Sequence, residues 1–296
     1  MCFRLIALRR TPYLWMLTVS FAMGLGTVPS TSAEPSLYSY GEACKKALRA
    51  YRQGWSEILE YGRWTEAERL YREAVAVEPN CSIAKSVLAR MTTDAAERKT
   101  LIAEIQSAID SVDGGGRLIL DPYLKTLLLI GARDTGESLG EDFRSDLSRM
   151  AISNYRSFLD RYPDEWAVRV EYVEWIHAAH GPEEALAKIR EMAVNDPTDS
   201  YRFSYFPAYF YAELGDYEHA IKLAREFVQQ LGPGDWPQEH YIFAFIAYER
   251  GDYAEANVSI KHALLLDPRH LIAGRLSKKI DTALATEHLP HAPEDG

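Results

Sequence analysis

The chain has 296 residues, of which 47% are hydrophobic and 26% are charged, values that exclude a disordered chain, a collagen-like chain and a polytopic membrane protein. With 43 acidic residues against 33 basic ones, the net charge is −10, and an acidic chain repels phosphate backbones, which argues against nucleic acid as a partner. The length alone predicts about two domains or one elongated domain.

The first 33 residues have the three parts of a secretory signal peptide. Three arginines and no acid lie among the first ten residues, and residues 13–28 carry no charge. This uncharged stretch is shorter than the ~20 residues that span a membrane, and small residues ending in Ala33 follow it. We therefore expect residues 1–33 to be cleaved and the remaining chain to be exported, to a bacterial periplasm or as a secreted protein. An uncleaved N-terminal anchor is the alternative, and it would be the only membrane contact.

A repeated pattern runs through the remaining chain. A glycine is followed five residues later by a small alanine in three places, at Gly62 and Ala67, Gly215 and Ala220, and Gly251 and Ala256. Proline ends the first and third of these units at Pro79 and Pro268, and weaker copies end at Pro163 and Pro197, 34 residues apart. The glycine suits a chain reversal with positive φ, the alanine a close helix–helix approach, and the proline a helix end.

This combination resembles the tetratricopeptide repeat (TPR), a helix–turn–helix unit of 34 residues. Apolar residues between the markers recur at three and four residues, which is the helical period, and no stretch alternates for long. The resemblance implies an all-α, right-handed α-solenoid of about six repeats over residues 34–287, closed by a C-terminal capping helix. We expect the tail, residues 288–296, to be disordered.

The predicted helices form six pairs and one cap. The pairs are 41–60 with 64–77, 81–91 with 93–112, 120–132 with 143–161, 165–179 with 182–195, 199–213 with 216–230, and 236–249 with 252–266, and the cap is 269–286. Gly114, Gly115 and Gly116 are expected to form a flexible break before the third pair.

Aromatic residues concentrate in the last two repeats, with seven among residues 201–211. In the family that the chain resembles, the first helices line a concave groove. The positions that the resemblance places in this groove are Arg202, Tyr205, Tyr209, Ala212, Gln238, Tyr241, Phe245 and Tyr248, with Glu174 and His177 from the unit before. Tyrosine offers a large rigid surface with a polar tip, which suits recognition, although packing between helices is expected to account for some of these rings.

Two cysteines remain after the leader, Cys44 and Cys81. The repeat places them near the starts of the first helices of units one and two. An even pair in an oxidising compartment forms a disulfide when the Cα atoms come within about 7 Å. The alternative is a pair of buried free thiols.

Motifs for catalysis and metal binding are weak. The G-x-S-x-G match at 136–140 lies in a predicted loop rather than on a strand-to-helix turn. His177 and His180 have Glu174 as their only nearby third ligand, and the tail histidines His288 and His291 would bind metal only adventitiously. We therefore expect no catalytic residues, no cofactor and no resident metal.

The sequence predicts a noncatalytic scaffold that binds a peptide or protein partner in its groove. A protein that binds a small ligand or glycan, or a repeat-fold enzyme, is the alternative. No feature of the sequence specifies an oligomeric state.

Overall fold

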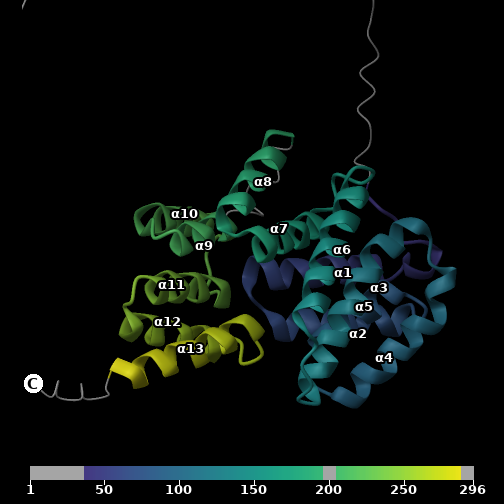
Figure 1. Ribbon diagram of the computed structural model, residues 1–296, viewed down its shortest axis with the longest axis horizontal. Coiled ribbons are helices and arrows are strands. Elements are labelled where there is room, and N and C mark those ends of the chain that lie inside the picture. Colours follow the sequence, from purple (N-terminus) through teal and green to yellow (C-terminus); the bar gives the residue numbers. More distant parts are fainter. Residues whose placement is uncertain (1–36, 196–204, 288–296) are drawn as a thin grey trace, which may run out of the picture. The chain divides into compact units, whose positions relative to one another are not determined.

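The computed structural model describes residues 37–195 and 205–287. The predicted leader, the predicted disordered tail and Arg202 lie outside these residues. Within them, all regular structure is helical, with thirteen α-helices and no strand (Figure 1). None of the described helices combines the length and the apolar character that crossing a membrane requires.

The α-helices pack in sequence-adjacent pairs, and α13 packs on α12. The pairs are α1 (Leu48–Ser56) with α2 (Trp64–Val77), α3 (Ser82–Met91) with α4 (Ala95–Ala108), α5 (Gly114–Asp134) with α6 (Glu141–Leu159), α7 (Trp166–His180) with α8 (Pro182–Asn195), α9 (Tyr205–Glu213) with α10 (Tyr217–Leu231), and α11 (Pro237–Glu249) with α12 (Tyr253–Leu266), followed by α13 (Leu271–Glu287). This confirms the predicted all-helical fold and its helix pairs.

The repeat markers have the conformations that their residue types predict. Gly62, Gly215 and Gly251 have φ of 70°, 79° and 88°, in the left-handed region that a side chain disfavours. Ala67, Ala220 and Ala256 are fully buried where paired helices meet.

The predicted first helix, residues 41–60, is divided into three short helical elements in the structure. A 3₁₀ turn, η1 (Glu42–Cys44), precedes α1, and a π-helical turn, η2 (Glu57–Tyr61), follows it and ends at Gly62. Cys44 in η1 and Cys81, which caps α3, form a disulfide with a Cα–Cα distance of 4.7 Å. Of the two alternatives that the sequence left open, the structure has the bonded pair.

The expected flexible break at Gly114–Gly116 is wrong, because these glycines form the first turn of α5. The Asp113 side chain caps this turn by accepting from the Gly116 amide at 2.7 Å. A Cβ on Gly115 would lie 2.9 Å from the Tyr38 ring. The absence of a side chain at Gly115 therefore allows the segment before α1, which contains Tyr38, to pack closely against the start of α5.

That N-terminal segment is held by a buried carboxylate. Glu165, which is 2% exposed, accepts from the Tyr38 amide at 2.8 Å and from the Arg52 guanidinium at 2.7 Å. The segment therefore joins the start of α1 to the start of α7 by charge-assisted hydrogen bonds.

Polar contacts join the first and last helix pairs. The amide and hydroxyl of Thr65 donate to the two carboxylate oxygens of Asp267, at 2.9 and 2.7 Å. Arg269 forms an ion pair with Glu68 and donates to the carbonyl of Met91 at 3.3 Å. We call this the closing contact, with residues 61–68 and Met91 on one side and Trp236, Gln238 and residues 267–270 on the other.

Ring contacts complete the closing contact. Tyr61 and Trp236 have centroids 4.7 Å apart, and Trp64 lies 5.8 Å from the His270 ring. Burial lowers the pKa of His270 to about 4, so that this buried ring is neutral at pH 7. Segments some 200 residues apart in the chain thus meet through both charged side chains and aromatic rings, among which His270 is neutral.

Candidate functional site

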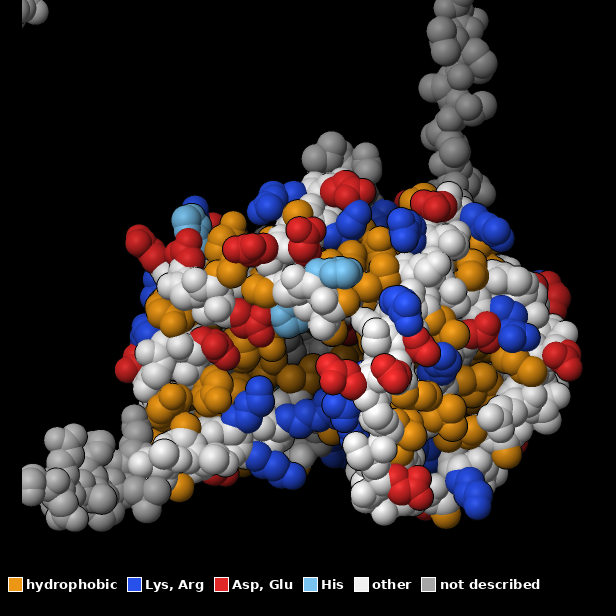
Figure 2. Space-filling view, viewed as in Figure 1, with side chains coloured by type: hydrophobic (Ala, Val, Ile, Leu, Met, Phe, Trp, Pro, Cys, Tyr) orange, Lys and Arg blue, Asp and Glu red, His pale blue; other side chains and the backbone are white. Residues whose placement is uncertain are grey.

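A cavity of about 390 Å³ lies among the first helices of the pairs. Its lining comes from the α1–η2 segment, α3, α5, α7, α9, α11 and α13, with Trp64 from the start of α2. Figure 2 shows a hollow with hydrophobic side chains inside it and basic side chains along one rim. A volume of this size is typical of pockets that take a small ligand or a few side chains of a partner.

Aromatic rings make up much of the wall. The seven that line the cavity are Trp55, Trp64, Tyr205, Phe206, Tyr209, Phe210 and Tyr241. Burial raises the pKa of the three tyrosines well above the ordinary value. Their phenols therefore stay neutral and can donate hydrogen bonds.

A buried ion pair lies at one side of the cavity. Arg90 on α3 donates to Glu171 on α7 at 2.8 Å, and its guanidinium lies 4.6 Å from the centroid of the Tyr123 ring. Glu171 is 3% exposed. Both charges are therefore satisfied within the protein and hold α3, α5 and α7 together.

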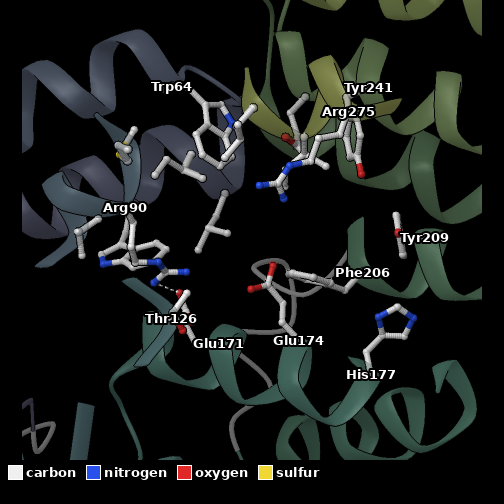
Figure 3. Close-up of a pocket in the computed structure, with 18 of the residues that line it drawn as sticks. Trp64, Arg90, Thr126, Glu171, Glu174, His177, Phe206, Tyr209, Tyr241 and Arg275 are labelled. Carbon is white, nitrogen blue, oxygen red and sulfur yellow. Dashed lines mark hydrogen bonds and ion pairs between the residues drawn. The ribbon is translucent and has the colours of Figure 1, made fainter. Parts of the chain in front are cut away.

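Glu174 lies one helical turn beyond Glu171, and its carboxyl group points into the cavity (Figure 3). No hydrogen bond or ion pair joins it to another described residue. Desolvation, together with the negative charge of Glu171, raises the pKa of Glu174 to about 8. At pH 7 this carboxyl is therefore mostly protonated, and it can both donate and accept a hydrogen bond.

Two arginines lie at the mouth of the cavity. Arg133 at the end of α5 and Arg275 on α13 are both exposed and both line it. Neither forms an ion pair with any residue in the described part of the chain. Burial, together with the charge of Arg133, lowers the pKa of Arg275. Two neighbouring cations without an acidic partner favour an anionic group of a ligand at this rim.

Six of the ten predicted groove residues line this cavity: Glu174, His177, Tyr205, Tyr209, Gln238 and Tyr241. Ala212 is buried on α9 and does not line it. His177 is tied to Glu213 through its Nε2 atom at 2.5 Å. Phe245 does not line the cavity but supports its wall, because its buried ring stacks on Tyr209 at 3.8 Å. Tyr248 packs on Tyr253 instead.

Sequence reasoning missed the half of the cavity that lies on α1, α3, α5 and α13. The rule that first helices face inward also applies to α3 and α5, and it would have identified Arg90 and Arg133. Arg275 could not be identified in this way, because the sequence pattern places it on the polar outer face of a capping helix. The closing contact brings α13 to the cavity, and the repeat pattern does not contain that contact.

The weak catalytic motif stays unsupported. Ser138 lies in the exposed loop between α5 and α6, and no strand precedes it in the part of the chain that the structure describes. Glu174 and the neutral tyrosines are among the hydrogen-bond donors that line the cavity. The cavity can therefore bind an apolar group and form hydrogen bonds with polar atoms attached to it, and two arginines lie at its rim.

The raised pKa of Glu174 predicts a pH-dependent effect of Glu174→Gln. The folded protein keeps this proton up to about pH 8, while the unfolded chain releases it near the ordinary value of 4.5. The contribution of Glu174 to the stability of the wild type therefore falls from pH 5 to pH 8, and the variant escapes that loss. We expect the variant to gain at least about 1 kcal/mol over the wild type across this interval.

Urea unfolding at pH 5, 6.5 and 8 measures this gain. The exposed Glu183→Gln on α8 is the control, which should show the same pH profile as the wild type. Parallel profiles for Glu174→Gln and the wild type would show that the Glu174 carboxyl ionises normally.

No protein-family model matches the chain, and no curated protein matches it.

Proposed function

We propose that this protein is a noncatalytic binding protein that acts outside the cytoplasm. Its partner is a peptide or protein, of which an apolar segment with an acidic group enters the cavity between α3, α5, α7, α9, α11 and α13. The observation that carries this proposal is the pairing of an aromatic wall with two unpartnered arginines at its mouth, Arg133 and Arg275.

The chemistry of each part supports this occupant. Apolar side chains of a partner gain free energy by leaving water for the ring-lined interior. A carboxylate beside Arg133 and Arg275 forms charge-assisted hydrogen bonds, which are stronger than neutral ones. Protonated Glu174 suits a peptide group, to which it can donate and from which it can accept.

We further infer that the helix pairs are TPR-like repeats, stacked as a right-handed solenoid. The glycine, alanine and proline markers and the lining of the cavity by first helices support this inference. In such a solenoid, the closing contact turns an open groove into a cavity of about 390 Å³, which has room for only a few side chains of a partner. An end or a short loop of the partner then fits better than a long strand.

Export is supported by the composition of residues 1–33 and by the Cys44–Cys81 disulfide. Structural disulfides persist mainly outside the reducing cytoplasm. The proposed compartment and the bonded pair are therefore consistent with one another.

Binding to a synthetic peptide library tests this function. Peptides of five residues are presented with either a free or an amidated C-terminus, and the bound peptides are identified by mass spectrometry. We expect enrichment of apolar peptides that carry an acidic group. Arg275→Ala should weaken the best peptide at least about 10-fold, because it removes a charge-assisted contact.

The exposed Arg225→Ala on α10 is a matched control, because it removes an arginine that does not line the cavity. Tyr209→Ala should also weaken capture, since it removes part of the ring wall. Equal capture by Arg275→Ala and Arg225→Ala would contradict the proposed binding mode.

A small ligand, with or without turnover, is the second candidate. The cavity volume favours it, as does the protonated Glu174, because a group with a pKa near neutrality is suited to acid–base chemistry. Turnover of a bound compound that Glu174→Gln abolishes would establish this alternative in place of the peptide.

A further inference from the structure

A group of three metal-ligand side chains lies outside the cavity, in the last helix pair. Asp235 precedes α11, His240 is on the first turns of α11, and His262 is on α12. The three ligand atoms all lie within 4.8 Å of one another. We propose that Asp235, His240 and His262 form a Zn²⁺ site.

The two imidazoles present the same atom to the same carboxylate. The Nε2 atom of His240 lies 2.5 Å from Oδ1 of Asp235, and that of His262 lies 2.9 Å from Oδ2. Zn²⁺ bonds to imidazole nitrogen and carboxylate oxygen at about 2.0–2.2 Å, so the ligand atoms of one tetrahedral ion lie about 3.3–3.6 Å apart. The two observed distances are hydrogen-bond distances and are shorter than that, while all three ligand atoms lie within 4.8 Å of one another. The side chains must therefore separate by about 1 Å or less from Asp235 to admit an ion.

The local structure holds these ligands near one another. The neighbour of Asp235 in the chain, Trp236, packs on the Tyr61 ring at 4.7 Å and thereby fixes the loop. The helices α11 and α12 lie side by side (Figure 1). The imidazole rings stack with centroids 4.0 Å apart and an interplanar angle of 26°. For both Nε2 lone pairs to point at one ion, the exposed His262 ring must rotate out of this stacked arrangement.

The ligand set favours zinc. Two imidazoles and one carboxylate combine borderline and hard ligands, which suit Zn²⁺ better than Ca²⁺ or Mg²⁺. Three protein ligands leave a fourth tetrahedral position for water, because the site is on the surface. The bound ion would join the loop before α11 to both helices of this pair.

A hydrogen-bonded His–Asp–His group without metal is the competing explanation, and metal titration separates the two. The protein is purified without an affinity tag and with His288 and His291 replaced by Ala, so that tail histidines do not compete. Zn²⁺ is added in calorimetric titrations, and Co²⁺ serves as a spectroscopic probe. We expect one Zn²⁺ per chain and a Co²⁺ absorption typical of low coordination number.

Single substitutions assign the ligands. His240→Ala and His262→Ala should each weaken Zn²⁺ binding at least about 10-fold, and Asp235→Asn should weaken it too. His219→Ala is the matched control, because His219 is an exposed histidine with one carboxylate partner, Asp216, at 2.7 Å. That variant should bind Zn²⁺ like the parent.

Thermal unfolding gives a second readout that needs no spectroscopic probe. Zn²⁺ at about 100 times the parent's Kd should raise the unfolding midpoint of the parent by roughly 5 °C, and should raise that of His262→Ala by at most about half as much, because its Kd is at least about 10-fold higher. Circular dichroism without metal checks that the surface variants fold. Absence of binding up to millimolar Zn²⁺, or equal binding by the parent and His262→Ala, would overturn the proposed site.

Discussion

Replacing Gly62 by alanine is expected to lower the free energy of unfolding by about 3 kcal/mol, and Gly251→Ala by only about 1–2 kcal/mol. Both glycines end the first helix of a repeat with a positive φ, 70° and 88°. Alanine at either position therefore has the same backbone penalty. A Cβ at Gly62 would also lie 2.6 Å from the backbone nitrogen of Gln238, whereas one at Gly251 meets nothing within 4 Å.

The difference between the two variants thus measures the closing contact. The contacted atom of Gln238 belongs to the backbone of α11. The α11 backbone cannot move without shifting the cavity wall, which Gln238 and Tyr241 help to form. We therefore expect Gly62→Ala to weaken peptide capture as well as stability, and Gly251→Ala to leave capture unchanged. Urea unfolding and the peptide assay provide the two measurements. Equal destabilisation by both substitutions would show that the first and last helix pairs do not press on each other in solution.

The helix pairs could be predicted from the sequence because each is encoded locally. The turn glycines, the buried alanines and the terminal prolines act within one repeat, and their conformational reasons do not depend on distant residues. For the same reason α2, α8 and α12 lie within about two residues of their predicted bounds. Errors arose where a distant segment decides the local structure, as at Gly115 under the Tyr38 ring.

The candidate site was predicted in part for the same reason. Tyr205, Tyr209 and Tyr241 were found because first helices face inward, which is a property of each repeat. The closing contact depends on Thr65 and Asp267, about 200 residues apart. Nothing in either residue's neighbourhood indicates its partner, so the cavity and the role of Arg275 emerge only in the folded chain.

Removing the Cys44–Cys81 disulfide is expected to destabilise the protein by about 4 kcal/mol, because it closes a loop of 37 residues in the unfolded chain. The Cys44→Ala, Cys81→Ala double variant tests this by urea unfolding. Alanine is chosen in place of serine because both positions are buried, and a serine hydroxyl would need a hydrogen-bond partner there. Reductant should lower the midpoint of the wild type and have no effect on the double variant.

The same pair links stability to the proposed compartment. Protein expressed with residues 1–33 and recovered from outside the cytoplasm should contain no reactive thiol after denaturation without reductant. Protein expressed in the cytoplasm without residues 1–33 should contain two, and should unfold at a lower urea concentration until it is oxidised. Two thiols in the exported protein, or equal midpoints before and after reduction, would contradict a structural role for the bond. The disulfide joins the turn before α1 to the start of α3. Reduction should therefore destabilise the first two helix pairs, whose α1 and α3 residues line one side of the cavity.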